Sequence, residues 1–125
     1  MKMYQIIECK KFYDTIKEKK LPLKVAYKFN KLLKRLEEEV TFYQEEFSKI
    51  INEFGEIDEN GEYVLTEDGQ GVRIKEGKFS ECQEKINELS EIEIVIDTIK
   101  FTLNELETLE LNITEVEWLM PFIEE

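Results

Sequence analysis

The chain of 125 residues contains no histidine, so the commonest general base and the commonest metal ligand are both absent. No Ser/His or Cys/His pair can therefore form an activated nucleophile. With only five glycines, the chain also has no glycine-rich loop of the kind that holds phosphates. We therefore predict a protein that is not an enzyme and that uses no cofactor and no metal ion.

Long apolar runs and paired cysteines are also missing. All apolar runs are shorter than the ~18 residues of a membrane-spanning helix, and MKMYQIIECKKF has no signal-peptide pattern. Cys9 and Cys82 lie far apart without a CxxC partner, which is typical of free thiols in a reducing compartment. The apolar content of 42% supports one modest core. We therefore expect a single cytoplasmic domain over residues 1–125.

Positive charge is scarce, and it is concentrated near the N-terminus. The 17 basic and 29 acidic residues give a net charge of -12. Residues 1–35 hold 11 basic and three acidic residues, whereas residues 36–125 hold six basic and 26 acidic residues. One interpretation is that the two segments pack together and cancel much of this asymmetry. The remaining negative charge opposes direct binding to nucleic acid and favours a basic partner.

Alternating spacings of three and four residues predict one long helix from about Pro22 to Phe54. Pro22 fits the first turn of a helix, and Gly55 follows the last apolar position as a stop signal. The apolar positions form a heptad seam that other helices or a second chain must cover. The seam residues are Ala26, Phe29, Leu33, Leu36, Val40, Tyr43, Phe47, Ile50 and Phe54.

Two further helices are predicted to pack antiparallel to the long helix, one on each half of it. The first ends near Lys20, and the other begins at a capping box made by Ser80 and Gln83. The apolar stripe of the first helix is Met3, Ile6, Cys9, Tyr13 and Ile16. The apolar stripe of the other helix is Phe79, Cys82, Ile86 and Leu89.

The remaining segments predict β-structure and short helices. Residues 62–65 and 72–74 flank an Asp-Gly turn, which predicts a β-hairpin. Isoleucines at 92, 94 and 96 alternate with Glu91 and Glu93 and precede Asp97, which predicts a third strand; the alternative is that this apolar run extends the preceding helix. Capping boxes start at Thr102 (with Glu105) and Thr114 (with Glu117), and they predict a helical turn and a final helix that Pro121 shortens. The expected fold class is α+β, mainly α.

Two acidic stretches resemble metal sites in composition. Residues 56–67 match most of the calcium-loop pattern, with Gly61 in sixth and Glu67 in twelfth position, but the first ligand is Glu56 and the exit is a predicted strand. We interpret this stretch as an acidic turn, and calcium binding is left open. We interpret the clusters at 37–39 and 45–46 as solvated helix surface rather than a magnesium site.

The basic residues of the first third lie among aromatic residues, a combination that also occurs in phosphate-binding surfaces. They are Lys10, Lys11, Lys17, Lys19, Lys20, Lys24, Lys28, Lys31, Lys34 and Arg35. We favour a solvated helical face or internal salt bridges instead, because Tyr13 and Phe29 belong to apolar stripes and the rest of the chain repels a polyanion.

Three segments of the chain are similar to a known group of proteins. They are KKLPLKVAY, DENGEYVLTEDGQGVRIK and LNELETLELNITEVEWLMPFIEE. Together they resemble short acidic proteins of unknown function that are encoded by phages and prophages of low-GC bacteria. The resemblance spans nearly the whole chain and implies a bacterial host cell and no catalytic residue. The order helix, hairpin, helix is also similar in outline to a prefoldin subunit.

Two hypotheses for function follow. The first is a phage-type acidic interaction protein that occludes a basic, nucleic-acid-handling surface of a bacterial protein, as anti-CRISPR and anti-restriction inhibitors do. The alternative is a phage morphogenesis protein, structural or chaperone-like, that acts through its coiled-coil seam. This alternative predicts self-association, for example as a homodimer, and the sequence does not determine the oligomeric state. Neither hypothesis involves direct contact with nucleic acid or a membrane. The predicted partner-binding residues are Glu38, Glu45, Glu46, Glu59, Glu67 and Asp68.

Overall fold

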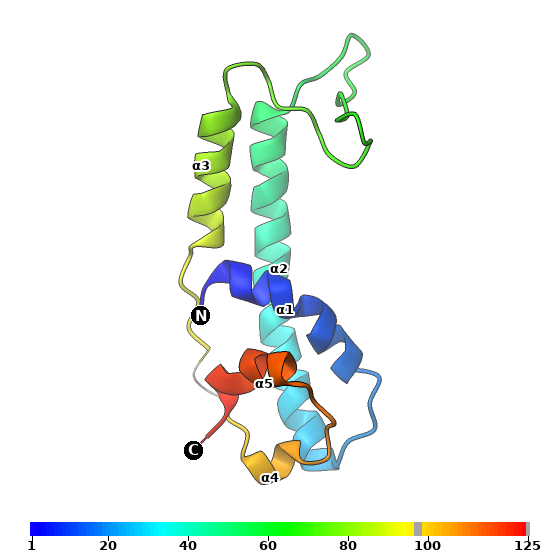
Figure 1. Ribbon diagram of the computed structural model, residues 1–125, viewed down its shortest axis with the longest axis vertical. Helices are drawn as coiled ribbons and strands as arrows, with labels where there is room; N and C mark the ends of the chain where they lie inside the picture. The colour runs from blue at the N-terminus through cyan, green and yellow to red at the C-terminus, as the bar shows by residue number, and fades with distance from the viewer. Residues whose placement is uncertain (97–98, 125) are drawn as a thin grey trace. The chain divides into compact units, whose positions relative to one another are not determined.

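The computed structural model describes residues 1–96 and 99–124, which form α-helices, one 3-10 helix and connecting loops (Figure 1). The elements are α1 (Met3–Ile16), α2 (Leu23–Phe54), α3 (Phe79–Ser90), α4 (Leu103–Leu106), α5 (Ile113–Leu119) and the 3-10 helix η1 (Met120–Phe122). No helix in the described ranges is long and apolar enough to cross a lipid bilayer. The chain divides into two compact units, a first unit of Met1–Val40 with Glu93–Glu125 and a second unit of Thr41–Ile92.

The long helix α2 begins and ends where the sequence predicts. The carbonyl of Pro22 accepts the first helical hydrogen bond, from the amide of Ala26 at 2.9 Å. At the other end the amide of Gly55 donates to the Ile51 carbonyl at 2.7 Å. A Cβ atom at position 55 would lie 2.6 Å from that carbonyl oxygen, so only glycine allows the chain to leave the helix here.

The first unit has a well-formed apolar core in which α1 packs against α2, as predicted (Figure 1). The predicted antiparallel course of this helix is wrong, because α1 crosses α2 obliquely (Figure 1). Phe29 of α2 stacks on Phe101 with ring centroids 4.4 Å apart. The Tyr13 hydroxyl of α1 donates to the Trp118 carbonyl of α5 at 3.0 Å. Buried residues of this core include Met3, Ile6, Cys9, Phe12, Ile16, Leu32, Leu36, Leu106, Leu119 and Phe122. The two terminal segments of the chain therefore share one core with the first half of α2.

In the second unit α3 packs antiparallel beside the last turns of α2, as predicted (Figure 1). Its buried apolar residues are few, namely Phe54, Cys82 and Leu89. The seam residues Tyr43, Phe47 and Ile50 are only half-buried. The heptad seam is therefore well covered in the first unit and partly open in the second.

The predicted β-hairpin is wrong for the described residues, which contain isolated bridges and no strand. The turn itself forms, because Gly69 has φ +71° and Thr66 donates its amide to the Gly71 carbonyl at 2.9 Å. Beyond the turn, the Val64 amide donates to the Glu56 carbonyl at 2.9 Å, and its carbonyl accepts from Arg73 at 2.7 Å. The backbone hydrogen bonds of Val64 are thus divided between Glu56 and Arg73, and no continuous β-ladder forms.

The third predicted strand is also absent from the described residues. One bridge, Lys2 with Glu93, and a 2.7 Å hydrogen bond from the Ile94 amide to the Met1 carbonyl replace it. Asp97, the last residue of the predicted alternation, lies outside the described residues. The segment after α3 therefore pairs with the N-terminus as irregular chain.

One of the three predicted capping boxes is confirmed. Thr102 accepts the Glu105 amide at 3.2 Å, and the Glu105 carboxylate accepts the Thr102 amide at 2.9 Å. The box at Ser80 is wrong, because α3 starts earlier with Lys78 as its N-cap. The box at Thr114 is also wrong, because Asn112 and Glu115 form the equivalent pair two residues earlier. Pro121 lies in η1 and ends α5, as expected.

Candidate functional site

The second unit carries most of the net charge of the chain. Thr41–Ile92 contains 14 acidic and five basic residues, a net charge of -9. The segments of the first unit contain 15 acidic and 12 basic residues, a net charge of -3. The second unit is therefore the acidic part of the molecule and the first candidate for a site that binds a basic partner.

Almost every basic side chain of the second unit is already held by a carboxylate within it. The pairs are Lys49 with Glu46 at 2.9 Å, Arg73 with Glu56 at 3.3 Å, Lys78 with Glu81 at 3.4 Å and Lys85 with Glu53 at 3.3 Å. The fifth, Lys75, donates to the Glu53 carbonyl at 3.3 Å. Among the described residues, Glu45, Glu59 and Glu67 are exposed and have no ion pair, so their charge is available to a partner.

The six predicted partner-binding residues belong to different segments of the chain. Glu38 is exposed but belongs to the first unit, where it lies 3.8 Å from Arg35. Glu45 and Glu46 lie on α2, and Glu46 is half-buried beside Lys49. The other three, Glu59, Glu67 and Asp68, lie in the loop between α2 and α3.

Asp68 is largely engaged by its own turn. Its carboxylate accepts from the Thr66 hydroxyl and from the Gln70 amide at 3.1 Å. The hydrogen bond from Thr66, followed by that from Gln70, holds the pKa of Asp68 below its ordinary value. This residue therefore stabilises the loop, and its charge is less free to meet a partner than that of Glu67.

The calcium-like stretch has a comparable local explanation. The Asp58 carboxylate accepts the backbone amides of Asn60 at 2.8 Å and Glu62 at 3.0 Å, and Gly61 has φ +79°. This is a side-chain-supported turn. Within residues 1–96 and 99–124, no three acidic or cysteine side chains come together in a way that would hold a metal ion.

Two grooves border the partly open seam of α2, and sequence reasoning missed both. The groove between α2 and α3 has a volume of about 480 Å³, and that between α2 and the following loop about 530 Å³. The first is lined by Phe42, Glu46, Lys49, Ile50, Glu53, Lys85, Glu88, Leu89 and Ile92. The second is lined by Phe47, Ser48, Ile51, Asn52, Tyr63, Gln70, Gly71 and Val72. The half-buried seam positions were their only sequence signal.

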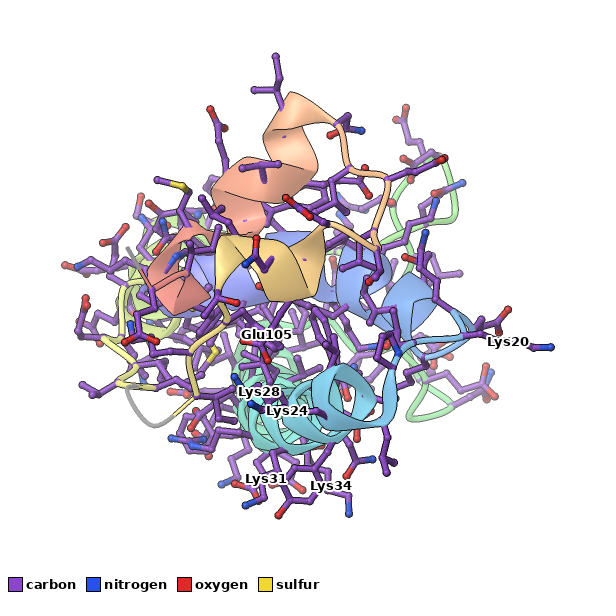
Figure 2. The ribbon with its side chains drawn as sticks, turned by 90° about the horizontal axis from the view of Figure 1, so that it is seen from below. Lys20, Lys24, Lys28, Lys31, Lys34 and Glu105 are labelled. Atoms are coloured by element: carbon purple, nitrogen blue, oxygen red, sulfur yellow. The ribbon has the colours of Figure 1, made fainter. Side chains whose placement is uncertain are left out.

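The basic stretch is only partly neutralised by the acidic segments. Lys28 pairs with Glu105 at 2.8 Å, and both lie between α2 and α4 in Figure 2. Lys17 pairs with Glu37. Figure 2 shows Lys31 and Lys34 on the side of α2 that faces away from α4 and α5. Exposed lysines of this stretch without an ion pair in the described chain include Lys11, Lys19, Lys20, Lys24 and Lys34.

Comparison with known protein families, with curated proteins and with solved structures found no match for this chain.

Proposed function

We propose that this protein is a non-enzymatic interaction protein whose acidic second unit binds a basic surface of another protein. The observation that carries the proposal is the net charge of -9 on Thr41–Ile92, with four of its five basic side chains already in internal ion pairs. The grooves beside α2 add apolar contact area within the same unit. Apolar contacts supply affinity, whereas complementary charge supplies rate and partner choice.

We further propose that the partner is a bacterial nucleic-acid-handling protein. The carboxylates of the second unit would then occupy the positions that nucleic-acid phosphates take on the partner's surface. The resemblance to phage proteins supports a bacterial partner, and the excess of acidic residues supports a surface that normally binds a polyanion. Binding of this kind would inhibit a CRISPR or restriction enzyme by covering its nucleic-acid site.

Charge reversal tests the proposal. The site variant carries Glu45→Lys, Glu59→Lys and Glu67→Lys, which break no ion pair in the described residues. The matched control carries Glu107→Lys, Glu110→Lys and Glu117→Lys, three exposed acids of the first unit. Both variants change the net charge equally.

Proteins captured from a bacterial lysate are identified, and the affinity of the purified partner is then measured at low and high salt. We expect the site variant to lose binding and the control to retain it, with affinity falling as salt rises. The captured partner should also lose its affinity for duplex DNA in the presence of this protein. Equal affinity of the wild type and the site variant would refute the proposal.

A second candidate function, self-assembly through the seam, is supported by the half-buried Tyr43, Phe47 and Ile50. A second copy packed on this face would bury the residues that α3 leaves accessible. Light scattering after size-exclusion chromatography should then show a dimer that Phe47→Asp converts to a monomer. A monomer of 15.0 kDa at high protein concentration would exclude this candidate.

A further inference from the structure

A pocket in the first unit differs from the grooves of the second unit in the charge at its rim. It lies between the segment that connects α1 to α2 and one face of α2, and its volume is about 290 Å³. That size is at the small end of the range of ligand-binding pockets, roughly 300–1,000 Å³. Its lining residues are Ile16, Lys17, Lys19, Leu21, Ala26, Phe29, Asn30, Leu33, Lys34 and Glu37.

The apolar residues in the lining of this pocket are held rigidly by the core. Ile16 and Phe29 are each 2% exposed, and Leu33 is 7% exposed, so these side chains are fixed in the core. Leu21 and Ala26 are half-buried and complete the apolar surface. A pocket wall that is already in place loses little conformational entropy when an apolar group binds to it.

The local sequence explains why the pocket stays open. α1 ends at Ile16. Beyond this helix end, the Lys19 amide donates a hydrogen bond to the Ile16 carbonyl at 3.1 Å. Leu21 precedes Pro22, which disfavours helical backbone at that residue. The chain therefore passes α2 as an irregular connection and leaves the helix face around Ala26 and Leu33 without a helix over it.

The rim of the pocket is positively charged in a chain of net charge -12. Lys17 is neutralised by its ion pair with Glu37. Lys19 and Lys34 are exposed and have no ion pair among the described residues, and Figure 2 shows Lys34 extending from α2. Asn30 adds an exposed side-chain amide on the same helix face. By contrast, the groove between α2 and α3 has three acidic and two basic side chains in its lining.

We infer that this pocket binds a small organic anion with an apolar body, such as a medium-chain carboxylate. The apolar body would contact Leu21, Ala26 and the edge of Leu33, and the anionic group would lie at the rim beside Lys19, Lys34 and Asn30. A ligand without charge uses only the apolar wall, and a cation is repelled by the two free lysines. The inference is independent of the proposed function, because its residues all belong to the first unit.

Titrations with three eight-carbon probes, observed by heteronuclear NMR, test the inference. Sodium octanoate should shift the amide signals of Ala26, Asn30 and Leu33 saturably, whereas octanol should bind at least about threefold more weakly and octylammonium should cause no saturable shift. Equal affinity for octanoate and octylammonium, or no saturable shift with octanoate, would overturn the inference. Vesicles of anionic phospholipid provide a further arm, since binding to vesicles without binding of octanoate would indicate a membrane surface instead.

Three variants locate the binding. Ala26→Leu fills the pocket with a residue that favours helix, and it should reduce octanoate affinity by about tenfold or more. Lys19→Glu combined with Lys34→Glu should weaken octanoate binding by at least about threefold and leave octanol binding unchanged. The matched control, Lys11→Glu with Lys24→Glu, changes the charge equally outside the pocket lining and should change octanoate affinity by less than about twofold. Octanoate binding that survives Ala26→Leu in a protein with unchanged circular dichroism would place the site elsewhere and refute the inference.

Discussion

Glu105 connects two helices through one carboxylate oxygen. That oxygen accepts from the Lys28 ammonium of α2 at 2.8 Å and from the Thr102 amide at 2.9 Å. In return, the Thr102 hydroxyl accepts the Glu105 amide at 3.2 Å. The side chains of Lys28 and Glu105 are 27% and 15% exposed, so this ion pair is better shielded from solvent than the pairs of the second unit.

This arrangement predicts a pH-dependent contribution to stability. Lys28, followed by the Thr102 amide, holds the pKa of Glu105 below its ordinary value of 4.5. A lowered folded-state pKa means that the stabilisation is complete above the unfolded-state pKa and is lost as pH falls through the folded-state pKa. Glu105→Gln should therefore lower the free energy of unfolding at pH 7, and the difference from wild type should shrink below about pH 4.5.

Urea unfolding at a series of pH values measures this difference. Glu107→Gln is a matched control, because Glu107 is exposed and has no ion pair in the described chain. Its effect on the free energy of unfolding should be small at every pH. A difference between wild type and Glu105→Gln that stays constant from pH 7 to about pH 2 would contradict the assignment.

Cys9 provides a second prediction at the scale of one residue. Burial, and to a smaller extent the neighbouring Glu8, raises the pKa of Cys9 to about 12. Because the thiolate is the reactive form, Cys9 in a Cys82→Ser variant should react with iodoacetamide at pH 8 more than about a hundredfold more slowly when folded than in urea. Mass spectrometry of timed samples measures both rates. Similar rates in the two states would show that α1 does not pack Cys9 into the core.

At the scale of elements, the apolar residues of the long helix α2 are regularly spaced but unevenly buried. Phe29 is 2% exposed and stacks on Phe101, whereas Phe47 is half-buried and stacks on Tyr43 at 5.8 Å. The heptad spacing treats these two positions alike, because spacing identifies the apolar face of a helix. It carries no information on how much of that face its neighbours cover.

Alanine substitutions at these two phenylalanines should have different effects on the free energy of unfolding, because the first half of α2 is well covered and the second half is partly open. Phe29→Ala should lower the free energy of unfolding by about 3–5 kcal/mol, the cost of a large cavity in a core. Phe47→Ala should lower it by less than about 2 kcal/mol, because solvent already reaches part of the ring. Urea unfolding measures both effects, and Phe29→Leu replaces Phe29→Ala if the latter does not fold. Equal costs at the two positions would contradict the burial pattern.

The sequence predicted the elements best where a local signal had no competitor. Pro22 and Gly55 bound α2 within one residue, and Thr102 caps α4 as expected. Where two signals compete, the outcome depends on the surrounding chain. Asn112 caps α5 in place of Thr114, because both begin a capping-box pattern and the helix starts at the earlier one. The start of α3 is set by a turn at Gly77, with φ +77°, and not by Ser80.

The candidate site was predictable in its charge but not in its form. The excess of carboxylates after residue 35 is visible in the sequence, and Glu45, Glu59 and Glu67 remain exposed without ion pairs in the described chain. Glu46 and Asp68 were predicted as equivalent, yet Lys49 and the turn at Thr66 engage them. The grooves were not predictable, because each is formed by two segments brought together only by folding.

At the scale of the whole molecule, repulsion between like charges opposes folding. The net charge is -12, and most ion pairs of the second unit have partners that are about half exposed or more, so each stabilises the fold little. Added salt screens the general repulsion as well as these weak attractions. Because the charges are predominantly of one sign, the loss of repulsion should dominate.

We therefore expect the melting temperature to rise by about 2–6 °C when NaCl is increased from about 0.02 M to about 0.5 M. Neutralising three unpaired acids, with Glu45→Gln, Glu59→Gln and Glu67→Gln, should raise the melting temperature at low salt and reduce its salt dependence. The matched variant Lys11→Gln, Lys20→Gln and Lys34→Gln removes three exposed positive charges and should increase the salt dependence instead. Circular dichroism at 222 nm follows the unfolding. A melting temperature that falls with added salt would show that attractive pairs outweigh repulsion in the folded protein.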